Sequence, residues 1–148
     1  MKTLTSLNNL NLNTLNKVYS KLTLNQRISQ LYKDFSKDDI MLTSSFAASS
    51  AMLLKLFSDV NSEQLIYFID TRYHFKETLI YKEHLTKLYG LNVNDLKAEK
   101  QNHNETKINK TWIKDPNKCC HVNKVEPLDK LKSIYKIWVS GLMKWQSD

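Results

Sequence analysis

The two cysteines of the chain are adjacent, at Cys119 and Cys120, in the stretch DPNKCCHVNKVEPL. Neighbouring cysteines make a poor disulfide with each other, and they supply only half of a four-ligand metal site. In a reducing compartment, cysteine clusters more often bind metal or carry out redox chemistry than form disulfides. The pair therefore indicates metal or redox chemistry that needs partners from elsewhere.

On residue type alone, other interpretations of these side chains stay open. A free cysteine is often a small buried hydrophobe. A zinc site that joins Cys119 and Cys120 with His103 and His121 is conceivable, although adjacent ligands strain a tetrahedron and the usual two-residue spacer is missing. His74 lies beside aromatic residues, where an imidazole serves either as a catalytic base or as a packing group.

A run of small hydroxylic residues, TSSFAASS at 43–50, connects an apolar stretch to a helical pattern. Backbone N–H groups at such a turn, together with the helix dipole, can hold a phosphate or sulfate without any lysine. The same residue types are also ordinary helix caps. Spacing alone does not decide between an anion site and a cap.

The elements that must position these residues alternate along the chain. Helical spacing in 14–35 predicts an amphipathic helix that precedes them. Short apolar or β-branched runs predict strands, and they lie within 39–45, 64–70, 91–96 and 137–142. Helical patterns separate them at 49–60, 76–90 and 125–136, and the polar stretch 98–118, broken by Pro116, is expected to be a long loop.

This alternation predicts an α/β fold with a parallel sheet. Ligands of open parallel sheets bind beyond the carboxyl ends of the strands. We therefore expect TSSFAASS (43–50), DTRYHFKET (70–78) and SGLMKWQS (140–147) to converge on one edge of the sheet.

Composition restricts the class of partner. The formal net charge is +7, which permits an anionic ligand. The basic residues between Lys97 and Lys132 are interleaved with acids, as on a solvated basic face, and aromatic residues are not interleaved with them as a nucleic-acid stacking groove requires. The sequence shows no signal peptide and no apolar window of membrane-spanning length. We therefore expect a cytoplasmic protein that binds neither nucleic acid nor membrane.

Four ordered segments together resemble the motifs of the assimilatory sulfonucleotide reductases, the adenylylsulfate and phosphoadenylylsulfate reductases. The segments are TSSFAASS (43–50), FIDTRYHFKET (68–78), CCHVNKVEPL (119–128) and WVSGLMKWQS (138–147). The resemblance covers roughly residues 36 to 147. It implies a Rossmann-like parallel sheet of the adenine nucleotide α-hydrolase-like superfamily, truncated after about four strands. The expected organisation is an N-terminal helical segment, 1–35, and a reductase-like domain, 36–148, that lacks its C-terminal part.

The resemblance assigns roles to residues that match the family's motifs. It implies that nucleotide contacts come from seven residues, which are Ser44, Ser45, Phe46, Ser50, Asp70, Thr71 and Lys124. The first four match a loop that cradles the phosphosulfate, and Asp70 and Thr71 match a segment that flanks the adenosine. The tandem cysteines, Cys119 and Cys120, match two ligands of a [4Fe–4S] cluster in the branch that mostly uses adenylylsulfate.

The same resemblance implies further cysteines that this sequence does not contain. A [4Fe–4S] cluster takes four thiolates, whereas this sequence has two cysteines. The family's nucleophile is a further cysteine in an E-C-G-x-H segment, which is absent from the sequence. The chain is therefore expected to be incomplete or inactive alone, with a complementing second chain or a homo-oligomer as a candidate source of the missing groups.

The motifs also depart from the family pattern. Ala47 and Arg72 replace glycines, and Arg72 stands where an unusual backbone angle is expected. Asn123 replaces an arginine, and Met143 and Lys144 replace two more. Lysine does not reproduce the bidentate fork of a guanidinium, so weakened anion binding is expected.

The sequence thus predicts an adenylylsulfate reductase of sulfate assimilation, which makes sulfite and AMP with thioredoxin or a glutathione-type thiol as electron donor. The alternatives are a non-catalytic nucleotide-binding remnant and an ATP-using relative such as the small subunit of sulfate adenylyltransferase. The tandem cysteines argue against the ATP-using relative.

Overall fold

The computed structural model describes residues 12–142 and divides the chain into two compact units, Met1–Lys37 and Asp38–Asp148. Met143 and Lys144, which stand where the fourth family motif has arginines, lie outside the described residues. The proposed domain boundary at residue 35 stays a prediction.

In its described part, from residue 12 onward, the first unit contains the helices α1 (Leu12–Tyr19) and α2 (Leu24–Asp34). The sequence predicted one helix over 14–35. This prediction was wrong for the middle of the segment, because the chain is not helical between the end of α1 and the start of α2. The chain breaks because Thr23 starts a new helix: its side chain accepts from the Gln26 amide, and the Gln26 side chain accepts from the Thr23 amide. This reciprocal capping box satisfies backbone donors that a continuous helix would have used internally.

The second unit is built on a parallel sheet, and the predicted α/β fold is confirmed. Its strands are β1 (Ile40–Ser44), β2 (Leu65–Ile69), β3 (Asn92–Leu96) and β4 (Ile137–Val139). They lie in the order β3-β2-β1-β4, and each neighbouring pair is parallel. A short 3₁₀ helix, Lys37–Asp39, leads into β1.

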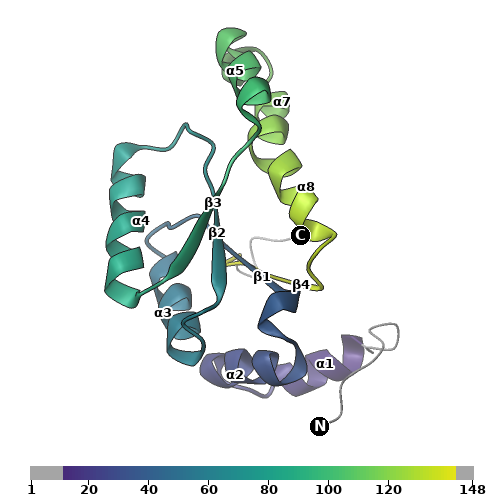
Figure 1. The fold of residues 1–148 in the computed structure, drawn as a ribbon. Coiled ribbons are helices and arrows are strands. Elements are labelled where there is room, and N and C mark those ends of the chain that lie inside the picture. Colours follow the sequence, from purple (N-terminus) through teal and green to yellow (C-terminus); the bar gives the residue numbers. More distant parts are fainter. Residues whose placement is uncertain (1–11, 143–148) are drawn as a thin grey trace. The chain divides into compact units, whose positions relative to one another are not determined.

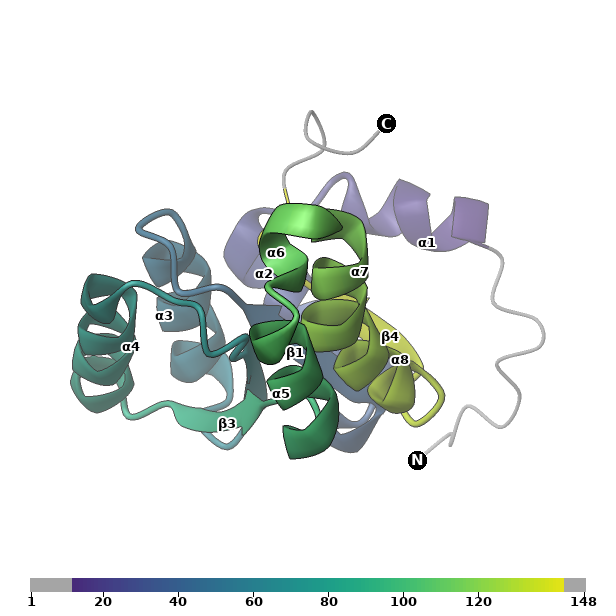
Figure 2. The same cartoon turned by 90° about the horizontal axis from the view of Figure 1, so that it is seen from above.

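The order of the strands determines which face of the sheet each helix covers. From β1 the chain steps to β2 and then β3 through α3 (Ser50–Val60) and α4 (Lys76–Tyr89), and it then returns to the other side of β1 as β4. Because parallel crossovers are right-handed, the reversal places the later helices on the opposite face, as Figures 1 and 2 show. Beside β1 the winding direction changes, and the carboxyl ends at such a point form the usual ligand crevice of this architecture.

Apolar side chains fill the space on both faces of the sheet. On the face that packs against the later helices, Met41 and Tyr67 form a cluster with Leu128. Side chains alternate across a strand, so Leu42 and Phe68, each fully buried, point to the other face. The two central strands, β1 and β2, are therefore buried on both sides, as is typical of parallel sheets.

The stretch 98–118, which the sequence predicted to be a loop, is helical, and that prediction was wrong. It contains α5 (Lys100–Ile108), α6 (Thr111–Lys114) and α7 (Pro116–Cys120). Few apolar residues mark these helices, so hydrophobic periodicity missed them. Pro116 begins α7 rather than interrupting a helix, since it stands at the first turn and the Asp115 side chain caps the Lys118 amide.

After α7 the chain continues as a π-helix, His121–Val125, and then as α8 (Glu126–Lys132). The helix predicted over 125–136 is thus shorter at its end and is preceded by π-helical geometry. Such segments are rare, and they occur often at functional sites.

The sheet edge formed by β4 is open in the described part of the chain. β4 pairs with β1 alone, and its Trp138 side chain is 50% exposed. Ile134 and Leu142, on either side of the strand in sequence, are also exposed.

Candidate functional site

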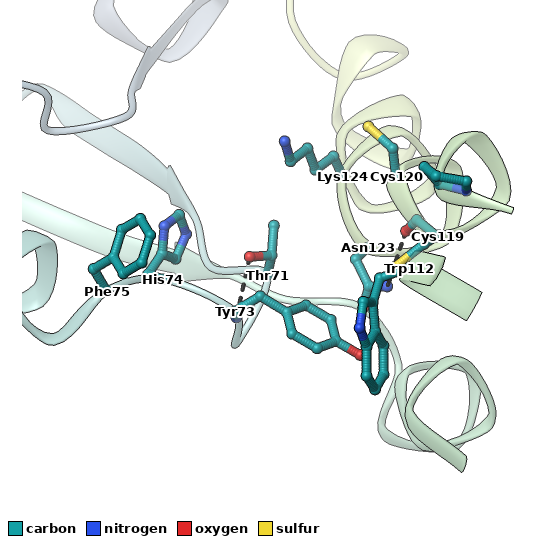
Figure 3. Close-up of a pocket in the computed structure, with 10 residues that line it drawn as sticks. Thr71, Tyr73, His74, Phe75, Trp112, Cys119, Cys120, Asn123 and Lys124 are labelled. Carbon is teal, nitrogen blue, oxygen red and sulfur yellow. Dashed lines mark hydrogen bonds between the residues drawn. The ribbon is translucent and has the colours of Figure 1, made fainter. Parts of the chain in front are cut away.

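A cavity of about 340 Å³ lies where the connection after β2 faces α7 and the π-helix. Its volume is within the range of small-molecule sites. Figure 3 shows most of its lining residues, which come from segments distant in sequence. They are Thr71, Tyr73, His74, Phe75, Trp112, Pro116, Cys119, Cys120, Asn123 and Lys124. The cavity thus joins predicted nucleotide contacts, Thr71 and Lys124, to the predicted cysteine pair.

The loop after β1 holds the other predicted phosphosulfate contacts, and its residues do not line this cavity. Ser45 is exposed, whereas Ser44 and Ser50 are half-buried. The Ser44 hydroxyl accepts a hydrogen bond from the Phe46 amide at 3.0 Å. Ser49, at the N-cap of α3, makes no side-chain cap, so the capping alternative for this residue is not realised.

Phe46 has a structural position that the motif did not reveal. Its ring is buried and packs edge-on against Phe68, with 5.7 Å between ring centroids. Its φ of 53° lies in the left-handed region, which is uncommon for a residue with a side chain. The buried ring holds this strained turn in place, so any contact of Phe46 with a ligand comes from its backbone.

Asp70 follows β2 directly, and it belongs to a row of alternating acidic and basic side chains. Lys97 Nζ lies 3.2 Å from the Asp70 carboxylate and 3.7 Å from that of Asp95, which also pairs with Lys82 at 2.6 Å. Desolvation opposes ionisation of Asp70, but the hydrogen bond from the Arg72 amide and the Lys97 ammonium outweigh it and lower the pKa of Asp70. Asp70 therefore stays ionised and fixes the start of the connection that leads to the cavity.

We expect Asp70→Asn to remove an acid-sensitive contribution to stability. A carboxylate whose pKa is lowered on folding stabilises the fold above its unfolded-state pKa of about 3.9, and this contribution is lost as the pH falls through the folded value. At pH 7 the variant should lose on the order of 1 kcal/mol, and the difference from wild type should shrink below about pH 4. Urea unfolding at pH 7 and at pH 3 measures it.

Asp59→Asn serves as the control for this prediction, because Asp59 forms an exposed pair with Lys55 within α3. Exposed helix pairs contribute little, so this variant should change stability by less than about 0.5 kcal/mol. A difference between wild type and Asp70→Asn that stays constant with pH would contradict the assigned role of the Asp70 charge.

Arg72 has the unusual backbone angle that the sequence predicted for a position where the family has glycine. Its φ is 60°, in the left-handed region. The guanidinium donates to the carbonyl of Ala98 from both terminal nitrogens, each at 3.3 Å. The side chain therefore ties the segment after β3 to the connection after β2, at the cost of a strained backbone.

We expect Arg72→Gly to be more stable than Arg72→Ala by about 1 kcal/mol, because both lose the guanidinium contact and glycine alone relieves the left-handed strain. Thermal unfolding of the two variants measures the difference. At the exposed helical position Lys87 the order of stability should reverse, with Lys87→Ala about 1 kcal/mol more stable than Lys87→Gly. The same order at both positions would contradict backbone strain at Arg72.

The cysteine pair lies at the end of α7, with Cys119 buried and Cys120 exposed. Within residues 12–142, no group of three or more His, Cys, Asp or Glu side chains could hold a metal ion, so the zinc alternative has no support there. The described residues supply two of the four thiolates of a [4Fe–4S] cluster. They therefore do not form a complete cluster site by themselves.

His74 is held by packing and by one hydrogen bond. Its Nε2 lies 2.9 Å from the Ile69 carbonyl oxygen, and its ring stacks on Phe68 with 4.7 Å between centroids. These contacts use the imidazole to attach the connection after β2 to the end of that strand. They favour the packing interpretation over the catalytic base.

Asn123 is the main functional candidate that motif matching misjudged. The motif comparison treated Asn123 only as the replacement of an arginine. In the structure its side chain is 2% exposed and hydrogen-bonds to His103, Thr106 and Cys119. Sequence reasoning could not find this cluster, because it placed His103 and Thr106 in a loop.

Aromatic side chains make up much of the remaining cavity wall. Tyr73 lies between His103 and Trp112, with ring centroids 5.2 Å and 5.6 Å away. Phe75 is largely exposed. Tyr73 and Phe75 follow the Asp70–Thr71 motif closely in the same connection, and this proximity is the sequence signal that could have identified them.

The fold and the cavity define a class before any relative is considered. The class is that of α/β proteins with a doubly wound parallel sheet, which commonly bind small molecules in a cavity beyond the carboxyl ends of the strands. Here the cavity joins a lysine and a cysteine pair. The family model "phosphoadenosine phosphosulfate reductase domain" matches residues 39–148. The chain belongs to this family, and the resemblance predicted from its motifs is confirmed.

Curated relatives support the assignment. An adenosine 5'-phosphosulfate reductase of Bacillus mycoides is 33% identical over 124 residues, which are 82% of this chain and 53% of the relative. One of Bacillus cereus is 32% identical over 120 residues, or 79% of this chain and 51% of the relative. The chain thus spans about half the length of the curated relatives it matches.

A solved structure supports the fold. The phosphoadenylyl-sulfate reductase of Candida auris, crystallised as a phosphate complex, superposes with a TM-score of 0.77 at 21% identity. The match covers 97% of this chain and 72% of that one. At this identity the likeness concerns the fold alone, and it confirms the predicted α/β fold with a parallel sheet.

Proposed function

We propose that this chain is the nucleotide-binding part of an adenylylsulfate reductase. Membership of the reductase family supports sulfonucleotide reduction, and the relatives named adenosine 5'-phosphosulfate reductase favour adenylylsulfate over phosphoadenylylsulfate. The observation that carries the proposal is the cavity that joins Thr71 and Lys124 to Cys119 and Cys120. It brings motifs about 50 residues apart in sequence to one place, which a chance match of short motifs would not do.

Lys124 and the loop after β1 supply the anion recognition in this proposal. Lys124 Nζ lines the cavity, and among residues 12–142 it has no ion-pair partner. Parallel pairing sets Ser44 beside Phe68, so the hydroxyls of Ser44, Ser45 and Ser50 lie at the same edge of the sheet as Asp70. A sulfonucleotide placed along this edge would meet hydroxyl and amide donors at one end and the lysine at the other.

The proposed reaction reduces the sulfur of adenylylsulfate by two electrons. A thiolate attacks this sulfur, the S–O bond to AMP breaks, and AMP leaves with the bonding pair. A second thiol then attacks the sulfur atom of the nucleophilic cysteine, so that a disulfide forms and sulfite is released. Thioredoxin or a glutathione-type thiol supplies the second thiol and carries away the oxidising equivalents.

Cys119 and Cys120 are not the nucleophile in this proposal. We assign them as two ligands of a [4Fe–4S] cluster, because thiolates are its usual ligands. Both remaining cluster thiolates and the nucleophilic thiol then come from sequence outside these 148 residues, in a second polypeptide or another part of a longer one. No step of the reaction above passes through the cluster.

The location of the protein is part of the same proposal. No helix within residues 12–142 has the length and apolar character needed to cross a membrane. We propose the cytoplasm, because a thiol-dependent reductase needs reduced cysteines and thiol donors.

Calorimetric titration of the chain with adenylylsulfate tests the proposed function. We expect one site per chain, weaker binding of AMP, which lacks the sulfate, and still weaker binding of ATP, which brings more negative charge to a cavity lined by a single lysine. Tighter binding of ATP than of adenylylsulfate would support the ATP-using alternative and overturn the proposal. A folded chain that binds none of the three would also overturn it.

A further inference from the structure

A buried polar cluster connects the cysteine helix to α5. The Asn123 side chain lies 2.8 Å from His103 Nδ1, 3.2 Å from Thr106 Oγ1 and 2.9 Å from the carbonyl oxygen of Cys119. His103, Thr106 and Asn123 are all buried, and each buried side-chain N or O of the described residues has a partner. Unpaired groups at such depth would cost about 1–3 kcal/mol each, so the cluster is strongly constrained.

The direction of each hydrogen bond follows from its neighbours. A carbonyl oxygen only accepts, so the atom of Asn123 that faces the Cys119 carbonyl is its amide nitrogen. The amide oxygen of Asn123 then accepts from His103, which places a proton on His103 Nδ1. Thr106 donates to the His103 carbonyl and accepts from Asn123. The amide of Asn123 therefore has a single orientation.

The same amide nitrogen approaches the Cys119 thiol, with 3.7 Å from Asn123 Nδ2 to Cys119 Sγ. Figure 3 shows Asn123 next to Cys119, while the Cys120 sulfur lies on the side of Lys124. The contact occurs at a junction, because the helix changes from α to π geometry directly after Cys120. Asn123 thus contacts both the backbone and the sulfur of one cysteine of the pair. Its amide has only two N–H groups, so the longer contact to sulfur shares a proton with one of the two oxygen acceptors.

We propose that Asn123 is a positioning residue for Cys119, and that His103 orients the Asn123 amide for this task. Asn123 holds the Cys119 sulfur at the buried side of the cavity, whereas Cys120 is left free to turn. Dispersed contacts with apolar neighbours would bury Cys119 equally well, but they would not fix the direction of its sulfur. The role of Cys119 in the reductase site rests on the proposed function, but its positioning by Asn123 does not.

Alkylation rates in the ligand-free chain test this inference. With iodoacetamide, Cys119 in a Cys120→Ser background should react at least tenfold more slowly than Cys120 in a Cys119→Ser background. Asn123→Leu, which has a similar volume but no amide, should raise the Cys119 rate at least tenfold and leave the Cys120 rate within twofold. Asn117→Leu is the control, since Asn117 is an exposed residue of the same helix, and it should change neither rate.

A conservative rescue separates orientation from simple packing. In His103→Asn the new amide nitrogen can occupy the place of Nδ1 and donate to Asn123, whereas His103→Leu cannot donate. We expect the Asn variant to keep Cys119 slow and the Leu variant to release it. Thr106→Ser, which keeps the hydroxyl, and Thr106→Val, which removes it, form a second pair of variants. If circular dichroism shows that Asn123→Leu does not fold, this pair replaces it in the test.

The outcomes distinguish this inference from the proposed function. An unchanged Cys119 rate in folded Asn123→Leu, or equal rates within both the His103 and the Thr106 pairs, would overturn the positioning role. Normal positioning in a chain that does not bind adenylylsulfate would overturn the proposed function alone.

Discussion

Phe68→Ala should destabilise the second unit by about 3–5 kcal/mol, the cost typical of a large aromatic residue removed from a core. Phe68 is 0% exposed on the central strand β2. Its ring contacts Phe46 and His74, and Lys82 Nζ lies 4.6 Å from the ring centroid. Because domains are stable by about 5–15 kcal/mol, the variant should be close to unfolding. Urea denaturation at pH 7 measures the loss.

Phe75→Ala provides a matched control, because it removes the same side chain seven residues away from a position that is 80% exposed. Its stability should change by less than about 0.5 kcal/mol. A loss below about 1.5 kcal/mol for Phe68→Ala would mean that the core around β2 relaxes into the space, in contrast to the close packing seen here.

The consequences of Phe68→Ala would reach the site through its neighbours. Phe46 depends on this ring to hold its left-handed turn, and His74 depends on it to attach the connection that leads to Thr71. Both segments that we propose to bind the ligand are therefore built on one buried aromatic side chain. A destabilised but folded variant should bind adenylylsulfate less well, even though Phe68 does not line the candidate cavity.

The sequence was sufficient for the centre of the sheet because β1 and β2 are buried and apolar. Ile66, Tyr67 and Phe68 form such a run, and Gly90, with φ of 60°, ends α4 in a left-handed cap. The prediction of secondary structure from the sequence failed where the buried side chains are polar. α5 buries His103 and Thr106, and hydrophobic periodicity cannot detect a helix of this kind.

The candidate site was predictable to the same extent. Motifs that directly follow strands, such as Asp70–Thr71, were located because the ends of parallel strands share an edge. The motif comparison described Asn123 only as the loss of an arginine. The hydrogen-bond partners of this buried amide are distant in sequence, so they become visible only in the three-dimensional structure. The loss of a guanidinium there is compensated structurally, because the amide completes a hydrogen-bonded cluster. This leaves Lys124 as the cation of the cavity on the π-helix.

Lys124→Ala should therefore weaken adenylylsulfate binding by about tenfold to 150-fold, since a charge-assisted hydrogen bond contributes about 1.5–3 kcal/mol. Lys124→Arg should lose less, because it keeps the charge but changes the geometry. Calorimetric titration at two salt concentrations measures both variants. The effect should be largest at low salt, where the anionic ligand is least screened.

Lys118→Ala is the matched control, because Lys118 is an exposed lysine of the adjacent helix α7 that does not line the cavity. Its removal changes the net charge by the same amount and should alter affinity by less than twofold. Equal losses in the two variants would mean that the basic surface attracts the nucleotide without a specific contact. A loss confined to Lys124 would instead place the anionic group of the ligand inside the cavity, beside the exposed cysteine of the pair.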